Sequence, residues 1–522
     1  MKKAMITNVW HIILIAVLLA LFLQVPIFYG VGKLSIISCN TRPTVGSVET
    51  FSPRRAGSSA SVYDATTNFH SGNVQKRDIA GSQPNQGSAS TAAVVSNFTR
   101  KQHKQSLRPH GHAHYPFVQF SAYRESPRVF FVIGITSVVA RKFDHVLVYK
   151  CEWHPKPNGS EPSQPSKVTD AELMYVYFDQ MPRIYVVAPV NCTFEDDVGM
   201  DVEEGGSLFM TVSVGPHPGD TERVLALQEQ KGEAVEAMRN RDQPLPLKYA
   251  FCGPPMHGNI RAEWVLHWLV YHHYLWRDSV HFFFYNVGGI TDSVRQVLSP
   301  FVHKGLLTIL DVEDQKEYPS WYFNQLLFVN DCLHRTRYLS SWTFFHDFDE
   351  FLAISSPNTL DKLLDEYKDA PYLSFGSLRA SPWICADIHP GSSEWPLQRM
   401  RWVEKQPYCC VPDQDPWLCI HGAGARKYAV NPRKVFAGGI HKTAIPEEGG
   451  VNLNASIARL HHYQGIVSNK STLCSSTVNA SMPLETLHQY FPSSNYYLRD
   501  DHVSTQIGKA REFDAELLSA YS

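Results

Sequence analysis

The stretch WTFFHDFDE, residues 342–350, decides the fold and the chemistry that this sequence predicts. Its first four residues are apolar, as expected of a buried strand. Asp347 and Asp349 follow where that strand should end, and ligands of open α/β sheets bind at the carboxyl ends of strands. Two carboxylates one residue apart can face one hard cation, Mn²⁺ or Mg²⁺, and that cation can bridge to a diphosphate. An Asp-x-Asp pair also occurs by chance on exposed loops, so it is the preceding strand that favours a metal site.

Strands and helices alternate along the chain that leads to this stretch. Helical periodicity and short apolar runs predict strands at 247–252, 280–285, 306–312 and 342–346, and helices at 262–275, 291–301 and 322–333. Strands that alternate with helices indicate right-handed crossovers and a mostly parallel central sheet. We therefore expect an α/β fold, with a catalytic domain over residues 241–515.

A β-rich region precedes this domain. Short runs rich in Val, Phe, Tyr and Ile, separated by turn formers, predict strands at 116–123, 129–139, 145–151, 173–178, 184–189 and 207–214. This spacing is typical of an antiparallel sandwich, so we expect a β-sandwich-like module over residues 113–240. Cys151 and Cys192 bracket part of it and are candidates for a disulfide. Residues 222–239 are rich in helix formers and predict a connecting helix.

The amino-terminal region predicts a membrane anchor. Residues 9–29 are almost wholly apolar, and a bilayer-spanning helix needs about 20 such residues. Pro26 and the bulky residues after it argue against signal cleavage, and Lys2 and Lys3 favour a cytoplasmic amino terminus. We expect a cytoplasmic tail (1–8), a transmembrane signal-anchor (9–29) and a flexible luminal stem (30–112), whose polar composition cannot bury enough surface to fold.

Composition agrees with a luminal protein and excludes some functions. Six Asn-x-Ser/Thr sites and ten cysteines suit a secretory lumen, where glycosylation and disulfides occur. The formal net charge of −2 gives the chain no electrostatic attraction to nucleic acid. The cysteines do not recur with zinc-finger spacing, so we predict no structural zinc site.

Several motifs resemble glycosyltransferase family 92. They are Cys252-Gly253-Pro254-Pro255 with Gly258-Asn259, Tyr322-Phe323-Asn324-Gln325, Asn330-Asp331-Cys332-Leu333-His334-Arg335, the 342–351 stretch, Arg426-Lys427-Tyr428-Ala429 and residues 459–463. The similarity covers about residues 247–480 and is greatest to the plant β-1,4-galactan synthases. The resemblance implies a GT-A fold, a type II Golgi membrane protein, a homodimer, and transfer of galactose from UDP-galactose to a cell-wall galactan of pectin.

The resemblance also assigns roles to individual residues. Asp347 and Asp349 would hold the metal and the diphosphate. His462 matches the family's late His-Tyr position and is the first candidate for a further metal ligand, and His441 is the second. The candidates for contacts with the nucleotide are Asn286 at the end of the second strand, and Asn324 and Gln325 on a helix that faces the same edge.

Inversion at the sugar needs a general base, which takes the proton of the acceptor hydroxyl. Asp387 is the first candidate and Glu394, next to Trp395, is the second; Asp413 and Asp415 are further ones. The cysteine-rich stretch 408–419 departs from the galactan synthase pattern, which leaves another glycan acceptor open. Two other classes are a membrane-anchored carbohydrate-binding protein with an inactive transferase domain and a metal-dependent hydrolase. The stem and anchor favour the transferase.

Overall fold

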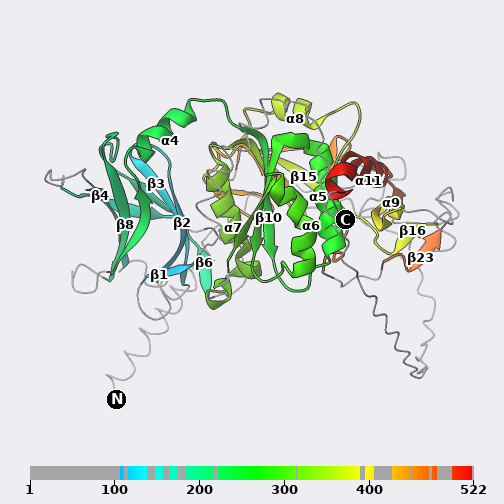
Figure 1. Ribbon diagram of the computed structural model, residues 1–522, viewed down its shortest axis with the longest axis horizontal. Helices are drawn as coiled ribbons and strands as arrows, with labels where there is room; N and C mark the ends of the chain where they lie inside the picture. The colour runs from blue at the N-terminus through cyan, green and yellow to red at the C-terminus, as the bar shows by residue number, and fades with distance from the viewer. Residues whose placement is uncertain are drawn as a thin grey trace, which may run out of the picture. The chain divides into compact units, whose positions relative to one another are not determined.

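The computed structural model describes thirteen segments of the chain (Figure 1). They are residues 106–110, 116–137, 147–156, 165–174, 176, 184–214, 222–312, 314–387, 394–404, 426–446, 448–468, 473–478 and 497–519. The predicted anchor, the stem to residue 105, Asp413, Asp415 and the 408–419 stretch lie outside these residues. No helix among the described residues is long and apolar enough to cross a membrane.

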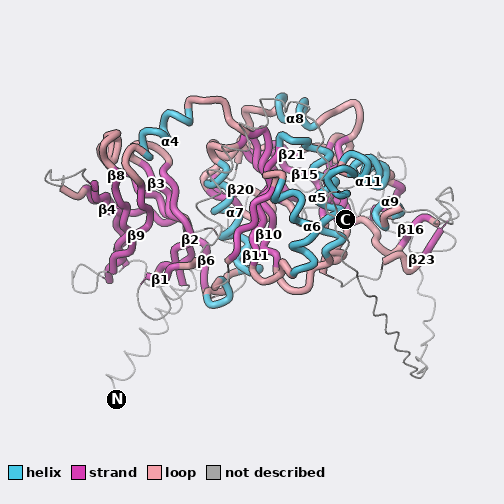
Figure 2. Tube along the Cα trace, in the orientation of Figure 1, coloured by secondary structure: helices cyan, strands magenta, loops and turns pink. Residues whose placement is uncertain are grey.

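The region before residue 247 is built from antiparallel strands (Figure 2). Its nine described strands are β1 (Arg108–His110), β2 (Phe117–Arg124), β3 (Val129–Ser137), β4 (Leu147–Lys156), β5 (Lys167–Leu173), β6 (Tyr185–Val187), β7 (Val190–Thr193), β8 (Gly205–Val214) and β9 (Glu222–Glu229). They run in the order β1-β2-β3-β7-β5-β4-β8-β9, with β6 beside β3. The antiparallel, β-rich character that the turn spacing predicts is therefore present.

Strand β5 connects the two halves of this β-rich region. Its first part pairs with β4 and its last part with β7, so β4 and β3 can pack across a common core. Trp153 from β4 stacks on Phe130 from β3 inside that core. The expected disulfide between Cys151 and Cys192 is present and joins β4 to β7.

The predicted connecting helix over residues 222–239 is wrong in its first half. Glu222–Glu229 is the strand β9, and only the helix α4 (Glu233–Arg241) follows the prediction. β9 pairs with β8 over most of its length. The hydrogen bonds of this pairing outweigh a weak local preference for helix, which tertiary context often overrides.

The second region has a mixed central sheet of nine described strands. They are β10 (Leu247–Met256), β11 (Val280–Asn286), β12 (Leu307–Asp311), β13 (Ser340–Phe345), β14 (Glu350–Ile354), β15 (Tyr372–Arg379), β18 (Arg426–Val430), β21 (Val451–Asn452) and β22 (Ala458–His462). The order is β12-β11-β10-β13-β18-β15-β22-β14, and β21 pairs with β15.

Parallel pairing is confined to part of this sheet. β12, β11, β10 and β13 are parallel, as their helical crossovers predict. β18 then pairs antiparallel with β13, and β14 antiparallel with β22. Parallel pairing recurs between β15 and its neighbours β21 and β22, so the predicted parallel order is unbroken only up to β13 and the sheet as a whole is mixed. The later strands have no regular alternation with helices, so no crossover rule constrains their direction.

Helices cover both faces of the sheet. The described ones are α5 (Ala262–Trp276), α6 (Asp292–His303), α7 (Trp321–Thr336), α8 (Leu360–Glu366), α9 (Pro396–Arg399), α11 (His502–Phe513) and α12 (Ala515–Ser519), with 3₁₀ turns η2 (Arg277–Ser279) and η3 (Gln315–Glu317). In Figure 1, α7 lies on one side of β10 and α5 and α6 on the other. Three small sheets complete the region: β16 (Ile384–Ala386) with β23 (Ser476–Val478), β17 (Trp402–Glu404) with β24 (Tyr497–Arg499), and β19 (Ala437–Gly438) with β20 (Thr443–Ile445).

Alternation along β11 explains the two layers. Phe282 and Phe284 pack with α5 and α6, whereas Phe283 and Tyr285 pack with α7 and with strands of the β-rich region. A strand that is apolar on both faces is typical of a covered parallel sheet. The β-rich region therefore shares a hydrophobic core with the α7 side of the central sheet.

Candidate active site

Phe348 and Glu350 hold the Asp347–Asp349 turn in place, the first by packing into the core and the second by a hydrogen bond to the backbone. Phe348 is 5% exposed and packs edge-on against Phe284, with ring centroids 4.7 Å apart. The Glu350 carboxylate accepts a hydrogen bond from the Asp347 backbone N–H at 2.8 Å. Because Phe348 points into the core, the two flanking aspartates are left at the end of β13, partly exposed.

Asp347 has two partners, one on the neighbouring strand β18 and one on helix α7. Lys427, on β18, lies with Nζ 2.9 Å from Asp347 Oδ2, and its side chain is only 4% exposed. Gln325, on α7, donates from Nε2 to Asp347 Oδ1 at 3.3 Å. Burial alone would raise the pKa of Asp347, but the Lys427 ammonium, together with His462 and His441, outweighs it and lowers that pKa. Asp347 therefore remains ionised beside a buried cation.

Asp349 faces the following strands of the sheet. β14 pairs with β22 so that Glu350 lies opposite His462, and this register places His462 Nε2 3.5 Å from Asp349 Oδ2. The Gly465 backbone N–H donates to the same oxygen at 3.2 Å. Burial would lower the pKa of His462, but the Asp349 carboxylate, with Glu350 and Asp347 behind it, raises it to about 9. The carboxylates of Asp347, Asp349 and Glu350 therefore give this part of the site a strong attraction for cations.

Glu350 and His441 complete the cluster. Burial raises the pKa of Glu350 to about 7, against the opposing effect of Lys427. His441 donates from Nδ1 to the Arg426 carbonyl at 2.9 Å, which leaves Nε2 as the basic nitrogen. Burial and the charge of Lys427 lower the pKa of His441, and it interacts electrostatically with both Asp347 and His462. All four predicted metal ligands are therefore in one neighbourhood.

The donors of this cluster match a divalent cation in chemical kind. Carboxylate oxygens and an imidazole nitrogen suit Mn²⁺, and carboxylates alone suit Mg²⁺. Among the described residues, no three His, Cys, Asp or Glu side chains are close enough together to hold a metal ion. In the arrangement described, Lys427 supplies the positive charge at Asp347.

The three predicted nucleotide contacts are placed differently from one another. Gln325 reaches the Asp347 carboxylate, as above. Asn286 uses its amide within its own loop: Nδ2 donates to Asp311 at 2.7 Å, and Oδ1 accepts from two backbone N–H groups after β11. Asn324 is fully buried, accepts from the Ser320 N–H at 2.7 Å and donates to the Gln315 carbonyl at 3.1 Å. In this structure the Asn324 amide shapes a loop, and its contact with a nucleotide stays a prediction.

The Asn324 loop has an unusual backbone. Tyr322, Phe323 and Asn324 all have positive φ, between 52° and 65°, a conformation that costs free energy for residues other than glycine. The turn leaves the side chains of Tyr322 and Phe323 exposed, and Phe323 stacks on His257 at 3.6 Å. Sequence periodicity predicts an ordinary helix start here, and no local signal distinguishes this turn. Strain of this kind clusters at ligand sites.

The two candidate bases lie outside this cluster of contacts. Asp387 is exposed and follows β16, which belongs to a small sheet with β23 (Figure 1). Glu394 is also exposed, and the neighbouring Trp395 stacks on His267 at 4.1 Å instead of presenting both faces to a ligand. Their assignment as bases stays a prediction.

Sequence reasoning missed Lys427 and Glu350 as members of the site. Glu350 is visible as the one charged residue of the strand sequence EFLAI, which is a usable signal, whereas Lys427 follows a second charged residue, Arg426. The position of Lys427 beside Asp347 depends on the antiparallel pairing of β13 with β18, in which Phe345 lies opposite Tyr428. That pairing spans a long sequence separation and leaves no local pattern.

Comparisons with known proteins agree on one family. The profile of glycosyltransferase family 92 matches residues 248–504. Galactan beta-1,4-galactosyltransferase GALS1 of Arabidopsis thaliana is 31% identical over 417 residues, which cover 80% of this chain and 79% of that protein. GALS3 of the same plant, with the same enzyme name, is 30% identical over 72% of each chain.

A comparison with solved structures is much weaker. A crystal structure of the galactosyltransferase LgtC, in complex with donor and acceptor sugar analogs, is 16% identical and covers 36% of this chain and 59% of that one. The TM-score of 0.18 is too low for this likeness to carry an argument.

Proposed function

Because this chain belongs to glycosyltransferase family 92, we propose that it is an inverting, metal-dependent galactosyltransferase that extends a β-1,4-galactan chain from UDP-galactose. The observation that carries the proposal is the position of Asp347 and Asp349 directly after β13, with His462 Nε2 3.5 Å from Asp349 Oδ2. The two plant relatives named above support galactose as the sugar and galactan as the acceptor. We also propose that the domain has the GT-A fold.

Each residue of the site can have a separate role in the transfer reaction. Asp347, Asp349 and His462 would hold a divalent cation, which stabilises the charge on the departing nucleoside diphosphate. Lys427 adds a fixed positive charge beside Asp347 in a buried position, where electrostatic effects are strongest. Gln325 donates to Asp347 and so holds the orientation of its carboxylate. Inversion also needs a base, for which Asp387 and Glu394 remain the candidates.

The test is Asp349→Asn in the part of the chain after residue 40. We expect transfer of galactose from UDP-galactose to galactan oligosaccharides to fall by about 100-fold or more, as when one electrostatic contact to the reacting centre is lost. Circular dichroism should be unchanged, because asparagine keeps the size of the replaced side chain. Asp369→Asn is the matched control, since Asp369 is 93% exposed on another loop. Normal transfer by Asp349→Asn would refute the site.

Product analysis separates the remaining classes of function. A transferase lengthens the oligosaccharide only when the nucleotide sugar is present. A metal-dependent hydrolase would shorten it, and a carbohydrate-binding protein with an inactive domain would bind it without turnover of any donor. Manganese, magnesium and a chelator, added in turn, test the proposed cation.

We also propose a location and two accessory parts from the sequence. Residues 9–29 would anchor the protein in the Golgi membrane as a type II protein, and residues 113–240 would form a carbohydrate-binding module in front of the luminal catalytic domain. Deleting residues 1–40 should then yield a secreted, active enzyme. Retention of that shortened chain inside the cell as a folded membrane protein would contradict the anchor. Light scattering of the secreted form tests the homodimer that the family resemblance implies.

A further inference from the structure

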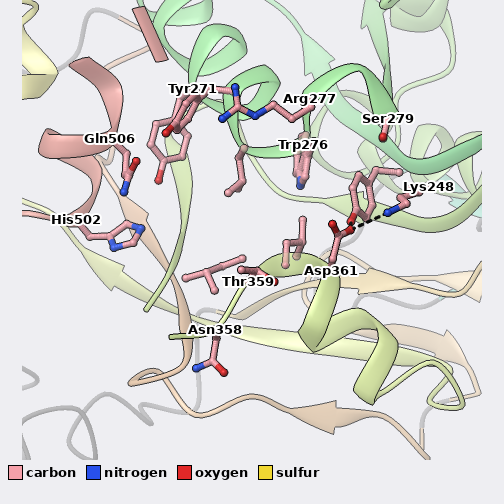
Figure 3. A pocket seen from close by; sticks show the side chains of 15 residues that line it. Lys248, Tyr271, Trp276, Arg277, Ser279, Asn358, Thr359, Asp361, His502 and Gln506 are labelled. Atoms are coloured by element: carbon pink, nitrogen blue, oxygen red, sulfur yellow. Dashed lines mark hydrogen bonds and ion pairs between the residues drawn. The ribbon is translucent and has the colours of Figure 1, made fainter. Parts of the chain in front are cut away.

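A cavity of about 340 Å³ opens at the edge of the central sheet remote from Asp347 (Figure 3). It is lined by Lys248 and Tyr249, which begin β10, and by Ser279, which precedes β11. Leu247 lies beside Ser340, the first residue of β13, whereas Asp347 follows the other end of that strand. At about 3.3 Å per strand residue, roughly 20 Å separate the two edges. The cavity is therefore distinct from the candidate active site.

Aromatic rings form much of the wall of this cavity. Tyr249, Tyr271, Tyr274 and Trp276 contribute to it from the start of β10 and the last turns of α5. Its volume lies at the lower end of the roughly 300–1,000 Å³ that is typical of small-molecule pockets. A single ring with its substituents fits this space better than a whole nucleotide sugar.

A buried donor points into the cavity. Trp276 is 2% exposed, and its indole Nε1 has no hydrogen-bond partner among the described residues. In Figure 3 the indole nitrogen is turned toward the cavity. A buried N–H without an acceptor is costly, and native proteins rarely leave one unexplained. An oxygen atom of a ligand in the cavity would satisfy it.

Polar groups of both kinds surround the aromatic wall. Asn358, from the loop before α8, and Gln506, from α11, line the cavity. A carboxamide carries both a donor and an acceptor. The Asp361 carboxylate accepts from the Tyr249 hydroxyl and pairs with Lys248 at 3.3 Å, so these charges largely cancel. The other charged group among the described lining residues is Arg277, whose guanidinium lies over two aromatic rings, so the lining matches a neutral ligand that has several hydroxyl groups.

The residue at the rim has a strained backbone. Arg277 has φ of 55°, although it is not glycine, and its guanidinium lies over the rings of Tyr274 and Phe513, at 4.3 and 4.2 Å. Such conformations are kept where the surroundings hold them and are common at ligand sites. In this backbone conformation the Arg277 guanidinium, an additional hydrogen-bond donor, lies beside the aromatic rings of the cavity.

The geometry points to a second carbohydrate-binding site, which holds one neutral pyranose unit of a glycan on the face of the catalytic domain remote from Asp347. A pyranose presents C–H groups to aromatic rings and hydroxyl groups to donors and acceptors alike, which is the combination found here. The identity of that glycan as galactan rests on the proposed function. A glycan held in this cavity would stay at high local concentration near the active site.

The test is binding of methyl β-galactoside and of β-1,4-galactotetraose, measured by calorimetry with UDP present in excess. The quantity compared is the difference between the wild type and each variant, in which binding at the acceptor site and at the β-rich module cancels. The double variant Asn358→Ala/Gln506→Ala should weaken binding of both sugars about tenfold, as should Trp276→Phe, which removes the indole N–H. Arg239→Ala changes an exposed arginine of the β-rich region and should bind as the wild type does. The double variant changes only partly exposed side chains, so it stays informative if Trp276→Phe does not fold.

Two results would overturn this inference. One is unchanged sugar binding in the double variant. The other is displacement of bound sugar by inorganic phosphate at the same site, which would indicate an anion pocket. Asp349→Asn separates this inference from the proposed function: it should abolish transfer and leave sugar binding at the cavity unchanged. Normal transfer by Asp349→Asn would refute the active site without changing the result at the cavity.

Discussion

Asp331 should stabilise the fold and take no direct part in transfer, although it lies in a motif shared with a transferase family. It is fully buried on α7, and its carboxylate accepts from the hydroxyls of Tyr123 and Tyr285, both at 2.6 Å. It also pairs with Arg335, one helical turn further on, at 3.0 Å. Tyr123 belongs to β2, so this carboxylate joins the β-rich region to the catalytic region.

The magnitude follows from what Asp331→Asn leaves behind. The amide has the same shape, but the charge is lost, and Arg335, buried at 7% exposure, then loses the charge of Asp331. Removing one partner of a buried ion pair costs about 3–5 kcal/mol of the free energy of unfolding. That is a large part of the roughly 5–15 kcal/mol that stabilises a typical domain.

Unfolding of residues 41–522 in urea, monitored by tryptophan fluorescence, measures this loss. Tyr123→Phe should cost less, about 1.5–3 kcal/mol, because it removes one hydrogen bond to a charged group. Combining it with Asp331→Asn should cost little more than Asp331→Asn alone, since both changes remove the same contact. Asp369→Asn, an exposed control, should leave the unfolding curve unchanged.

Activity completes the test. At a temperature where the Asp331→Asn variant is folded, its turnover number should stay within a few-fold of that of the wild type. Loss of less than about 1 kcal/mol would show that the buried network does not stabilise the fold as the geometry implies. Loss of transfer with normal stability would place Asp331 in the catalytic machinery instead.

Three further outcomes are expected. Gly253→Ala should slow transfer more than it lowers stability, because the new methyl carbon would lie 2.7 Å from Cζ of Phe348. Phe348 is the residue between Asp347 and Asp349, so its displacement would move both carboxylates. Kinetics and urea unfolding of one preparation check this. Lys427→Met should lower both the rate of transfer and the free energy of unfolding, the latter by about 1–3 kcal/mol, because the partly exposed Asp347 and the buried Glu350 lose their cation; calorimetry measures the loss. The free energy of unfolding should fall as pH drops from 6.5 toward 3. Burial lowers the pKa of His272 to about 3, so in this pH range His272 binds a proton only in the unfolded chain. His272→Asn should therefore reduce the slope of the unfolding free energy against pH.

Local pattern predicted the part of the fold that depends on near neighbours in sequence. The strand and helix alternation before residue 346 follows from hydrophobic periodicity, and the parallel order of β12, β11, β10 and β13 follows from right-handed crossovers. The position of Asp347 and Asp349 at a strand end follows from the apolar run before them. The helix predicted over residues 222–229 was wrong, because a strand at a sheet edge is stabilised by its partner and not by its own propensity.

The sequence by itself determined which chemical groups this protein has at the end of β13 and which family it belongs to. Only the tertiary structure decided that Lys427 lies against Asp347 and His462 against Asp349, because β18 and β22 reach that edge by pairing over a long sequence separation. It also decided that the Asn324 amide holds a strained turn and that Trp276 faces a cavity. Side-chain direction after long-range pairing depends on register, and a shift of one residue would turn Lys427 and His462 to the other faces of β18 and β22.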